Sequence, residues 1–176
     1  MASNAYVFQT NWHFHAAIEE VAAIIEDVES LSRWWPSVYL AVEVLEPGAE
    51  GGIGKKVKLF TKGWLPYTLR WNFTVTQSNS PHGFTIVADG DFVGQGVWTL
   101  AQKGPTTTVV FDWVIEADKP LLRSLSFLLK PIFEANHRWA MERGCESLEF
   151  ELRRRRGEAN VPDPPKATWP HRSARA

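Results

Sequence analysis

The feature that most constrains the fold is an alternation of apolar and polar side chains that recurs over residues 38–117. Its clearest stretch covers residues 67–76, where aromatic and aliphatic side chains occupy one face of an extended chain and Thr, Arg and Asn occupy the other. Short connections, such as residues 47–48 and 103–105, separate about six such runs. Because connections of this length join adjacent antiparallel strands, the region predicts an antiparallel meander.

One strand and two short helices are predicted before the meander. Alternation over residues 6–14 predicts the strand, with Tyr6 and Phe8 on the same face. Apolar residues at helical spacing predict a short helix over residues 18–25. A second short helix is expected over residues 29–35, where a following proline ends it.

A long helical pattern follows the meander, from Asp118 as a predicted N-cap to about Leu152. Pro131 lies inside it and is expected to kink or split the helix. Residues 157–176 are polar, Pro-rich and without a period, which predicts a disordered tail after a domain of residues 1–156. The elements together predict an α+β fold in which a curled antiparallel sheet of about seven strands surrounds the long C-terminal helix and leaves a space between them.

Several local patterns together carry a resemblance to a known family. They are a strand running into a helix at residues 14–21, the D…W…W spacing of residues 27–35, the sheet segment 90–100, and Asn136-His137 followed by Met141 and Gly144 in the last helix. Over roughly residues 5–152 the chain resembles the START-like superfamily, also called SRPBCC, and within it the polyketide cyclase/dehydrase-like branch. Ala17 departs from the family, which often has Pro there.

The resemblance implies the helix-grip fold and a deep hydrophobic cavity that binds lipids, sterols, polyketides or other apolar ligands. It does not imply a single activity, because some relatives catalyse cyclisation or dehydration and others only carry or sense a ligand.

Aromatic residues make up the candidate ligand site. The chain has nine Trp, ten Phe and three Tyr in 176 residues, and such rings either fill a core or line a binding site. Gly94 and Gly96 share a strand with Trp98, where missing side chains favour a bend or a close approach by a ligand. The side chains predicted to bind ligand are those of Trp71, Phe73, Trp98, Phe111, Trp113, Phe133, His137 and Met141.

His137 is the one catalytic candidate in this set. It shares an apolar helix face with Phe133 and Gly144, where an imidazole can anchor a ligand's carbonyl or hydroxyl group or act as a general acid or base. The alternative is a buried histidine satisfied by a backbone carbonyl. No second titratable group is evident in the sequence, since the adjacent Asn136 points about 100° away around the helix.

Two further segments are candidate surface sites. Trp64 and Leu65 lie in a predicted hairpin connection, where they either form the mouth of the cavity, with transient membrane contact, or fold back onto the sheet. The arginines at residues 153–156 end the last helix, where they complement its dipole; the alternative is contact with an anion.

Other functional classes are disfavoured. A net charge of −1 creates no field for nucleic acid, and the one cysteine forms no disulfide framework. His13 and His15 have no Cys, Asp or Glu beside them, so no metal or other cofactor is expected. The absence of a signal peptide and of a long apolar run leads to an expected cytoplasmic location.

The sequence therefore predicts a carrier or sensor of a hydrophobic small molecule or lipid. The alternatives are a cyclase or dehydratase that uses the same cavity, and a protein-interaction module with a closed core. Neither the ligand nor the oligomeric state follows from the sequence.

Overall fold

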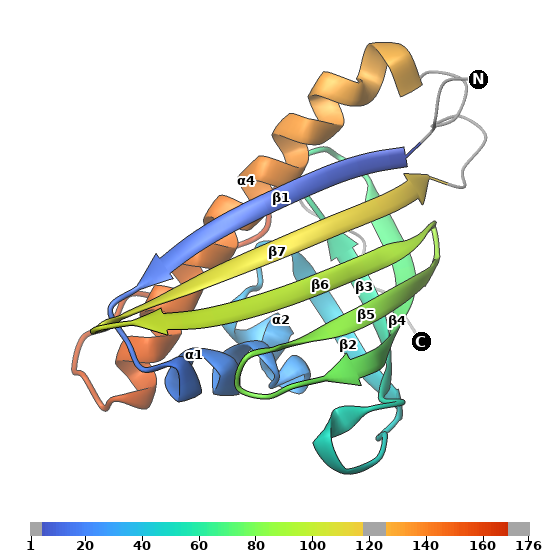
Figure 1. Cartoon of the computed structure of the whole chain (residues 1–176). Coiled ribbons are helices and arrows are strands. Elements are labelled where there is room, and N and C mark those ends of the chain that lie inside the picture. The colour runs from blue at the N-terminus through green and yellow to red at the C-terminus, as the bar shows by residue number, and fades with distance from the viewer. Residues whose placement is uncertain (1–4, 118–125, 169–176) are drawn as a thin grey trace.

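Seven antiparallel strands form one sheet in the computed structural model, which describes residues 5–117 and 126–168 (Figure 1). The strands are β1 (Ala5–Phe14), β2 (Tyr39–Glu46), β3 (Lys56–Lys62), β4 (Thr68–Ser78), β5 (Gly83–Gly90), β6 (Phe92–Lys103) and β7 (Thr106–Ala117). Their order across the sheet is β1-β7-β6-β5-β4-β3-β2. The predicted antiparallel meander is confirmed, and β1 extends it by pairing with β7.

The helices differ from the predictions mainly in their bounds. The first, α1 (Ile18–Ile25), lies where it was predicted. The second is divided between a 3-10 turn, η1 (Val28–Ser30), and the single turn of α2 (Leu31–Trp34). Another 3-10 turn, η2 (Glu50–Gly52), lies between β2 and β3.

The C-terminal helix, α4, covers Ser126–Arg155 and extends the predicted end by three residues. The expected split at Pro131 is wrong, because α4 runs through this residue as one helix. Pro131 is the sixth residue of α4, so the one backbone hydrogen bond that it removes lies near the N-terminal end of the helix. The predicted N-cap, Asp118, lies outside the described residues.

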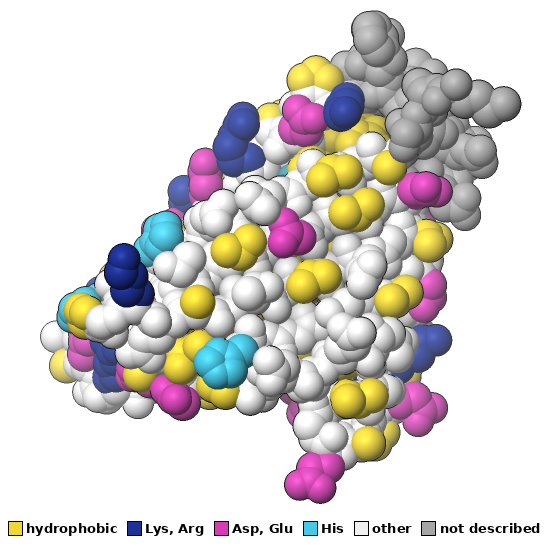
Figure 2. Space-filling view, viewed as in Figure 1, with side chains coloured by type: hydrophobic (Ala, Val, Ile, Leu, Met, Phe, Trp, Pro, Cys, Tyr) yellow, Lys and Arg dark blue, Asp and Glu magenta, His cyan; other side chains and the backbone are white. Residues whose placement is uncertain are grey.

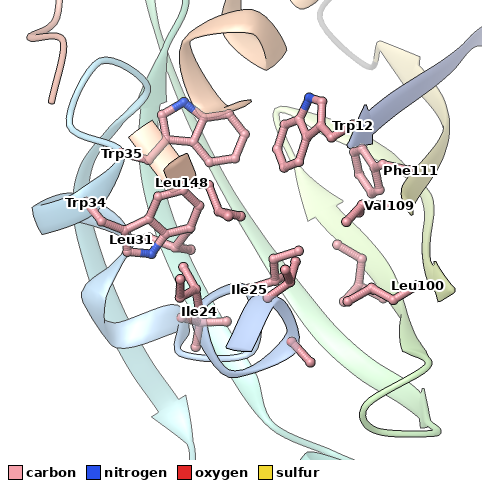
Figure 3. Packing of buried hydrophobic residues seen from close by; sticks show 14 of the residues in the cluster. Trp12, Ile24, Ile25, Leu31, Trp34, Trp35, Leu100, Val109, Phe111 and Leu148 are labelled. Carbon is pink, nitrogen blue, oxygen red and sulfur yellow. The ribbon is translucent and has the colours of Figure 1, made fainter. Parts of the chain in front are cut away.

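The sheet curls around α4, and α1 and α2 close one end of the space between them (Figure 1). At that end the core is filled by aliphatic side chains and two tryptophans, among them Ile24, Leu31, Trp34 and Leu148 (Figure 3). A Cβ built on Gly144 would lie 2.2 Å from Cζ2 of Trp35, so the indole packs directly against the backbone of α4. The helix-grip architecture is therefore confirmed.

Ion pairs join the C-terminal end of α4 to α1 and α2. Glu151 is 1% exposed and accepts hydrogen bonds from Arg33 at 2.7 and 2.9 Å and from Arg155 at 2.9 Å. Arg156 pairs with Glu20 of α1 at 2.8 Å. The arginines that end α4 thus bind the chain's own carboxylates as well as complementing the helix dipole.

Residues 157–168, here called the C-terminal strap, return from the end of α4 to the connection between β3 and β4. The ammonium of Lys62 donates a hydrogen bond to the carbonyl of Thr168. The Thr168 hydroxyl donates to the carbonyls of Gly63 at 3.4 Å and Trp64 at 3.3 Å. Disorder was predicted for residues 157–176, whereas in the described part of this segment Thr168 has hydrogen-bond partners on β3 and on the connection that follows it.

Candidate functional site: an aromatic cavity

An apolar cavity of about 200 Å³ lies between the sheet and α4. All seven strands contribute residues to its lining, as do α1, α2 and α4. Most of these residues are aromatic or aliphatic, and Lys62 is the one lining residue of the described chain that carries a charge at neutral pH. Such a chamber suits a ligand that leaves water mainly through its apolar surface.

The eight residues predicted to bind ligand are all brought together around this cavity. They come from β4, β6, β7 and α4, so the fold gathers side chains that lie up to 70 positions apart in the sequence. The lining includes all of them: Trp71, Phe73, Trp98, Phe111, Trp113, Phe133, His137 and Met141. Their contact with a ligand remains a prediction.

Three of these rings form a stacked wall on β6 and β7. The rings of Trp98 and Phe111 lie 4.1 Å apart and within 18° of parallel, and Phe111 and Trp113 lie 5.6 Å apart. A Cβ at Gly96 would lie 2.8 Å from Trp113 and 2.9 Å from Phe111. Gly96 therefore makes room for the rings of the wall, which offers a planar ligand a flat stacking surface.

His137 presents a neutral imidazole to this cavity. Its ring stacks on Phe8 at 4.2 Å, and Nε2 is buried with no hydrogen-bond partner in the part of the chain that the structure describes. Burial lowers the pKa of His137 to about 4, so the ring is uncharged near neutral pH. The backbone carbonyl considered as its alternative partner is not found at Nε2.

Tyr6 is a lining residue that the sequence analysis did not select. Its ring meets Phe133 edge-on at 5.8 Å and lies 6.1 Å from Phe8, and its buried hydroxyl has no partner among the described residues. Burial, and then the charge of Glu134, raise the pKa of Tyr6. The sequence contained a pattern that could have identified Tyr6 as a lining residue, because alternation places Tyr6 and Phe8 on the same face of β1.

Trp34 and Trp35 were also missed as lining residues. Trp35 contacts Tyr39 edge-on, with ring centres 5.1 Å apart, and lies beside Leu148 in the packed core (Figure 3). The sequence gave no apolar periodicity from which to predict the inward face of this segment, because α2 is a single turn.

The connection between β3 and β4 borders the cavity through Gly63, whereas Trp64 and Leu65 are not among the lining residues. The backbone N–H of Leu65 donates to Oδ1 of Asn136 at 3.3 Å, which holds this connection against α4. Trp64 is 36% exposed. Its proposed place at the mouth of the cavity stays a prediction.

Two further observations concern metal ligands and membrane spans in the described residues. No group of three metal-binding side chains occurs among them. None of their helices combines the length and hydropathy needed to cross a bilayer.

Comparison with known proteins supports the same fold. A START superfamily protein from Mycobacterium smegmatis aligns with a TM-score of 0.68 at 15% identity, over 84% of this chain and 97% of that chain. The protein TTHA0849 from Thermus thermophilus aligns with a TM-score of 0.66 at 19% identity, over 84% and 97%. The Zhui aromatase/cyclase from a Streptomyces species aligns with a TM-score of 0.64 at 16% identity, over 88% and 97%.

At these identities the solved structures establish the fold alone. No match is found among curated proteins. The sequence itself is more decisive, because residues 7–153 match the family described as polyketide cyclase / dehydrase and lipid transport. The match spans most of the chain and includes most of β1, all of β2 to β7 and the cavity-lining part of α4, so the protein belongs to this family.

Proposed function

We propose that the protein binds a hydrophobic small molecule in this cavity and acts as its carrier or sensor. The observation that carries the proposal is an unfilled, aromatic-lined cavity inside an otherwise packed domain. Filling it with a ligand removes apolar surface from water, which stabilises the complex by about 25 cal/mol per Å² before ordering costs. His137 supplies a polar group that orients the ligand.

A cyclase or dehydratase is the second candidate, and one observation favours it. Tyr6 and His137 are two polar groups that border the same Phe8 ring, and Tyr6 Oη and His137 Nε2 lack partners among the described residues. Such a pair has the composition of a proton donor and acceptor. Binding remains the first proposal because, within the described chain, no carboxylate or second imidazole is hydrogen-bonded to either atom to set its proton affinity.

The interaction module fits less well, because that hypothesis required a closed core. The outward face of β1, β7 and β6 carries apolar side chains scattered among polar ones (Figure 2). Val7, which is 71% exposed, pairs across the strands with the exposed Val114. Exposed valines of this kind are ordinary on a sheet surface and do not by themselves indicate a partner.

The test begins with native mass spectrometry of freshly purified protein and extraction of any bound molecule into organic solvent. Binding of the neutral dye N-phenyl-1-naphthylamine is then compared between Ala140→Phe, which fills the cavity, and Ala41→Phe, which adds the same ring on an exposed part of β2. We expect the first variant to lose dye binding and the second to retain it. Equal binding by both folded variants, without a co-purifying molecule, would contradict a ligand in this cavity.

Product analysis separates the two candidates once a ligand is identified. A carrier returns the molecule unchanged after incubation, whereas a cyclase returns a ring-closed isomer and a dehydratase returns a product that has lost water. Because Tyr6→Phe keeps the ring and removes only the hydroxyl, it lowers turnover more than binding if the second candidate is correct.

A further inference from the structure

Among the described lining residues, no cation is free to meet a bound anion. Lys62 is the one charged lining residue of the described chain. On β3 it follows Thr61, whose hydroxyl accepts a buried hydrogen bond from Trp71 on the cavity side. Since successive side chains of a strand point to opposite faces, Lys62 points away from this side, and its ammonium donates to the Thr168 carbonyl of the strap.

The polar atoms that remain near the cavity are uncharged. Four buried atoms of lining residues have no partner in the described chain, namely Tyr6 Oη, His137 Nε2 and the indole Nε1 atoms of Trp34 and Trp35. The two indoles belong to the packed core beside α1 and α2, which leaves Tyr6 and His137 as the pair next to Phe8. Their rings flank Phe8, with ring-centre distances of 6.1 Å for Tyr6 and 4.2 Å for His137. A hydrogen-bonding group that is buried and unpaired is unfavourable, so a ligand oxygen that reaches either atom relieves a cost present in the empty protein.

We infer that the cavity selects a neutral ligand, apolar over most of its length, with a carbonyl or hydroxyl oxygen at the end that meets Tyr6 and His137, and that it discriminates against carboxylates. This inference rests on the proposed function and adds the chemical class of the ligand. A ketone, ester or phenol accepts a hydrogen bond from the Tyr6 hydroxyl without carrying charge into the apolar chamber. A free fatty acid or other carboxylate loses its hydration there without gaining a counter-charge.

Three naphthalenes of nearly the same shape test the inference. 2-Acetylnaphthalene carries a neutral acceptor, 2-isopropylnaphthalene carries none, and 2-naphthoate carries a negative charge. Each is titrated as a competitor of N-phenyl-1-naphthylamine on the full chain near neutral pH. We expect naphthoate to bind at least about tenfold more weakly than the ketone, because Lys62, the one cation of the described lining, already donates to the strap.

The role of the two side chains is judged from the change in affinity of each compound on mutation. Affinities of different compounds are not compared directly for this purpose, because a ketone loses more hydration free energy than a hydrocarbon when it leaves water. Tyr6→Phe removes one hydroxyl and is expected to weaken binding of the ketone about five- to tenfold while changing binding of the isopropyl compound less than about twofold. His137→Phe is expected to show the same selectivity. If the His137 variant does not fold, Tyr6→Phe alone decides the matter.

The outcomes separate this inference from the proposed function. If both neutral compounds bind but Tyr6→Phe affects them equally, the polar end is assigned wrongly while ligand binding stands. If naphthoate binds most tightly, the preference for a neutral ligand is overturned. Failure of all three compounds to bind counts against the proposed function and against this inference with it.

Discussion

Single side chains set the chemistry of the cavity. One of them, His137, is expected to make the stability of the folded chain sensitive to acid. Its pKa of about 4 in the folded chain lies below the ordinary value of 6.5, so the unfolded chain takes up a proton in this range that the folded chain does not. Stability that is complete above pH 6.5 is therefore lost as the pH falls toward 4. We expect a loss of about 2 kcal/mol between about pH 7 and about pH 5.

Urea unfolding of the wild type and of His137→Phe at these two pH values checks the prediction. The variant has no imidazole to protonate, so its stability should change less across the interval. Glu20, whose pKa Arg156 lowers to about 2, loses its contribution at more acidic pH and is a separate effect. An equal loss in both proteins would mean that the acid sensitivity arises elsewhere.

At Gly144, α4 packs directly against the indole of Trp35. In an open helix, alanine is favoured over glycine by about 1 kcal/mol. Here the new methyl group would meet Trp35 at 2.2 Å, so Gly144→Ala is expected to destabilise the protein by about 1–3 kcal/mol. The same change made in a Trp35→Ala background should cost less or stabilise, since the ring it meets is gone; thermal unfolding of the four proteins gives the coupling.

Whole elements are held by contacts that join distant parts of the chain, as at the end of α4. Glu151→Gln removes the carboxylate that Arg33 and Arg155 share, and we expect a loss of about 2 kcal/mol in the free energy of unfolding because both arginines are partly exposed. Glu149→Gln, on an exposed position of the same helix, is the control and should change stability by less than about 0.5 kcal/mol. Similar effects of the two changes would show that the contacts of Glu151 with the two arginines do not contribute to the free energy of unfolding.

The sequence predicted most elements because their signals are local. Alternation identified the strands, and apolar spacing identified α1 to the residue. The contacts of the strap could not be predicted in this way, because Thr168 bonds to Lys62 and to carbonyls that lie about 105 positions earlier in the chain. Composition alone favoured disorder for residues 157–176, and only the fold shows where the partners of Thr168 lie.

The candidate site was predicted through its rings and missed in its polar atoms. Strand faces placed Trp71 and Trp113 in the interior, and the fold turned those faces toward one cavity. Tyr6 was assigned to a face but not to the site, because its importance lies in a buried hydroxyl left unpaired in the described chain. Whether a buried polar atom has a partner is a property of the whole arrangement and has no pattern in the sequence.

At the scale of the whole molecule, the cavity separates the sheet from the middle of α4, while the end near α1 is packed. A bound ligand contacts both sides and binds only the folded chain, so it stabilises the fold. At a ligand concentration about 100 times its Kd the gain is about 2.7 kcal/mol. For a chain of this length that corresponds to a rise of about 5–10 °C in Tm, which we expect for 2-acetylnaphthalene in a thermal unfolding experiment.

Hydrogen exchange shows where this stabilisation acts. Amides of α4 around His137 and of the wall strands β6 and β7 should become more protected when ligand is bound, because the ligand then links the helix to these strands across the cavity. Amides around η2 lie away from the lining and serve as the internal control, since they gain no contact. Protection that rises uniformly, η2 included, would mean that the ligand acts only through global unfolding. A rise in Tm without added protection at α4 would place the ligand outside this cavity, because contact across it cannot stabilise the chain without holding the helix to the sheet.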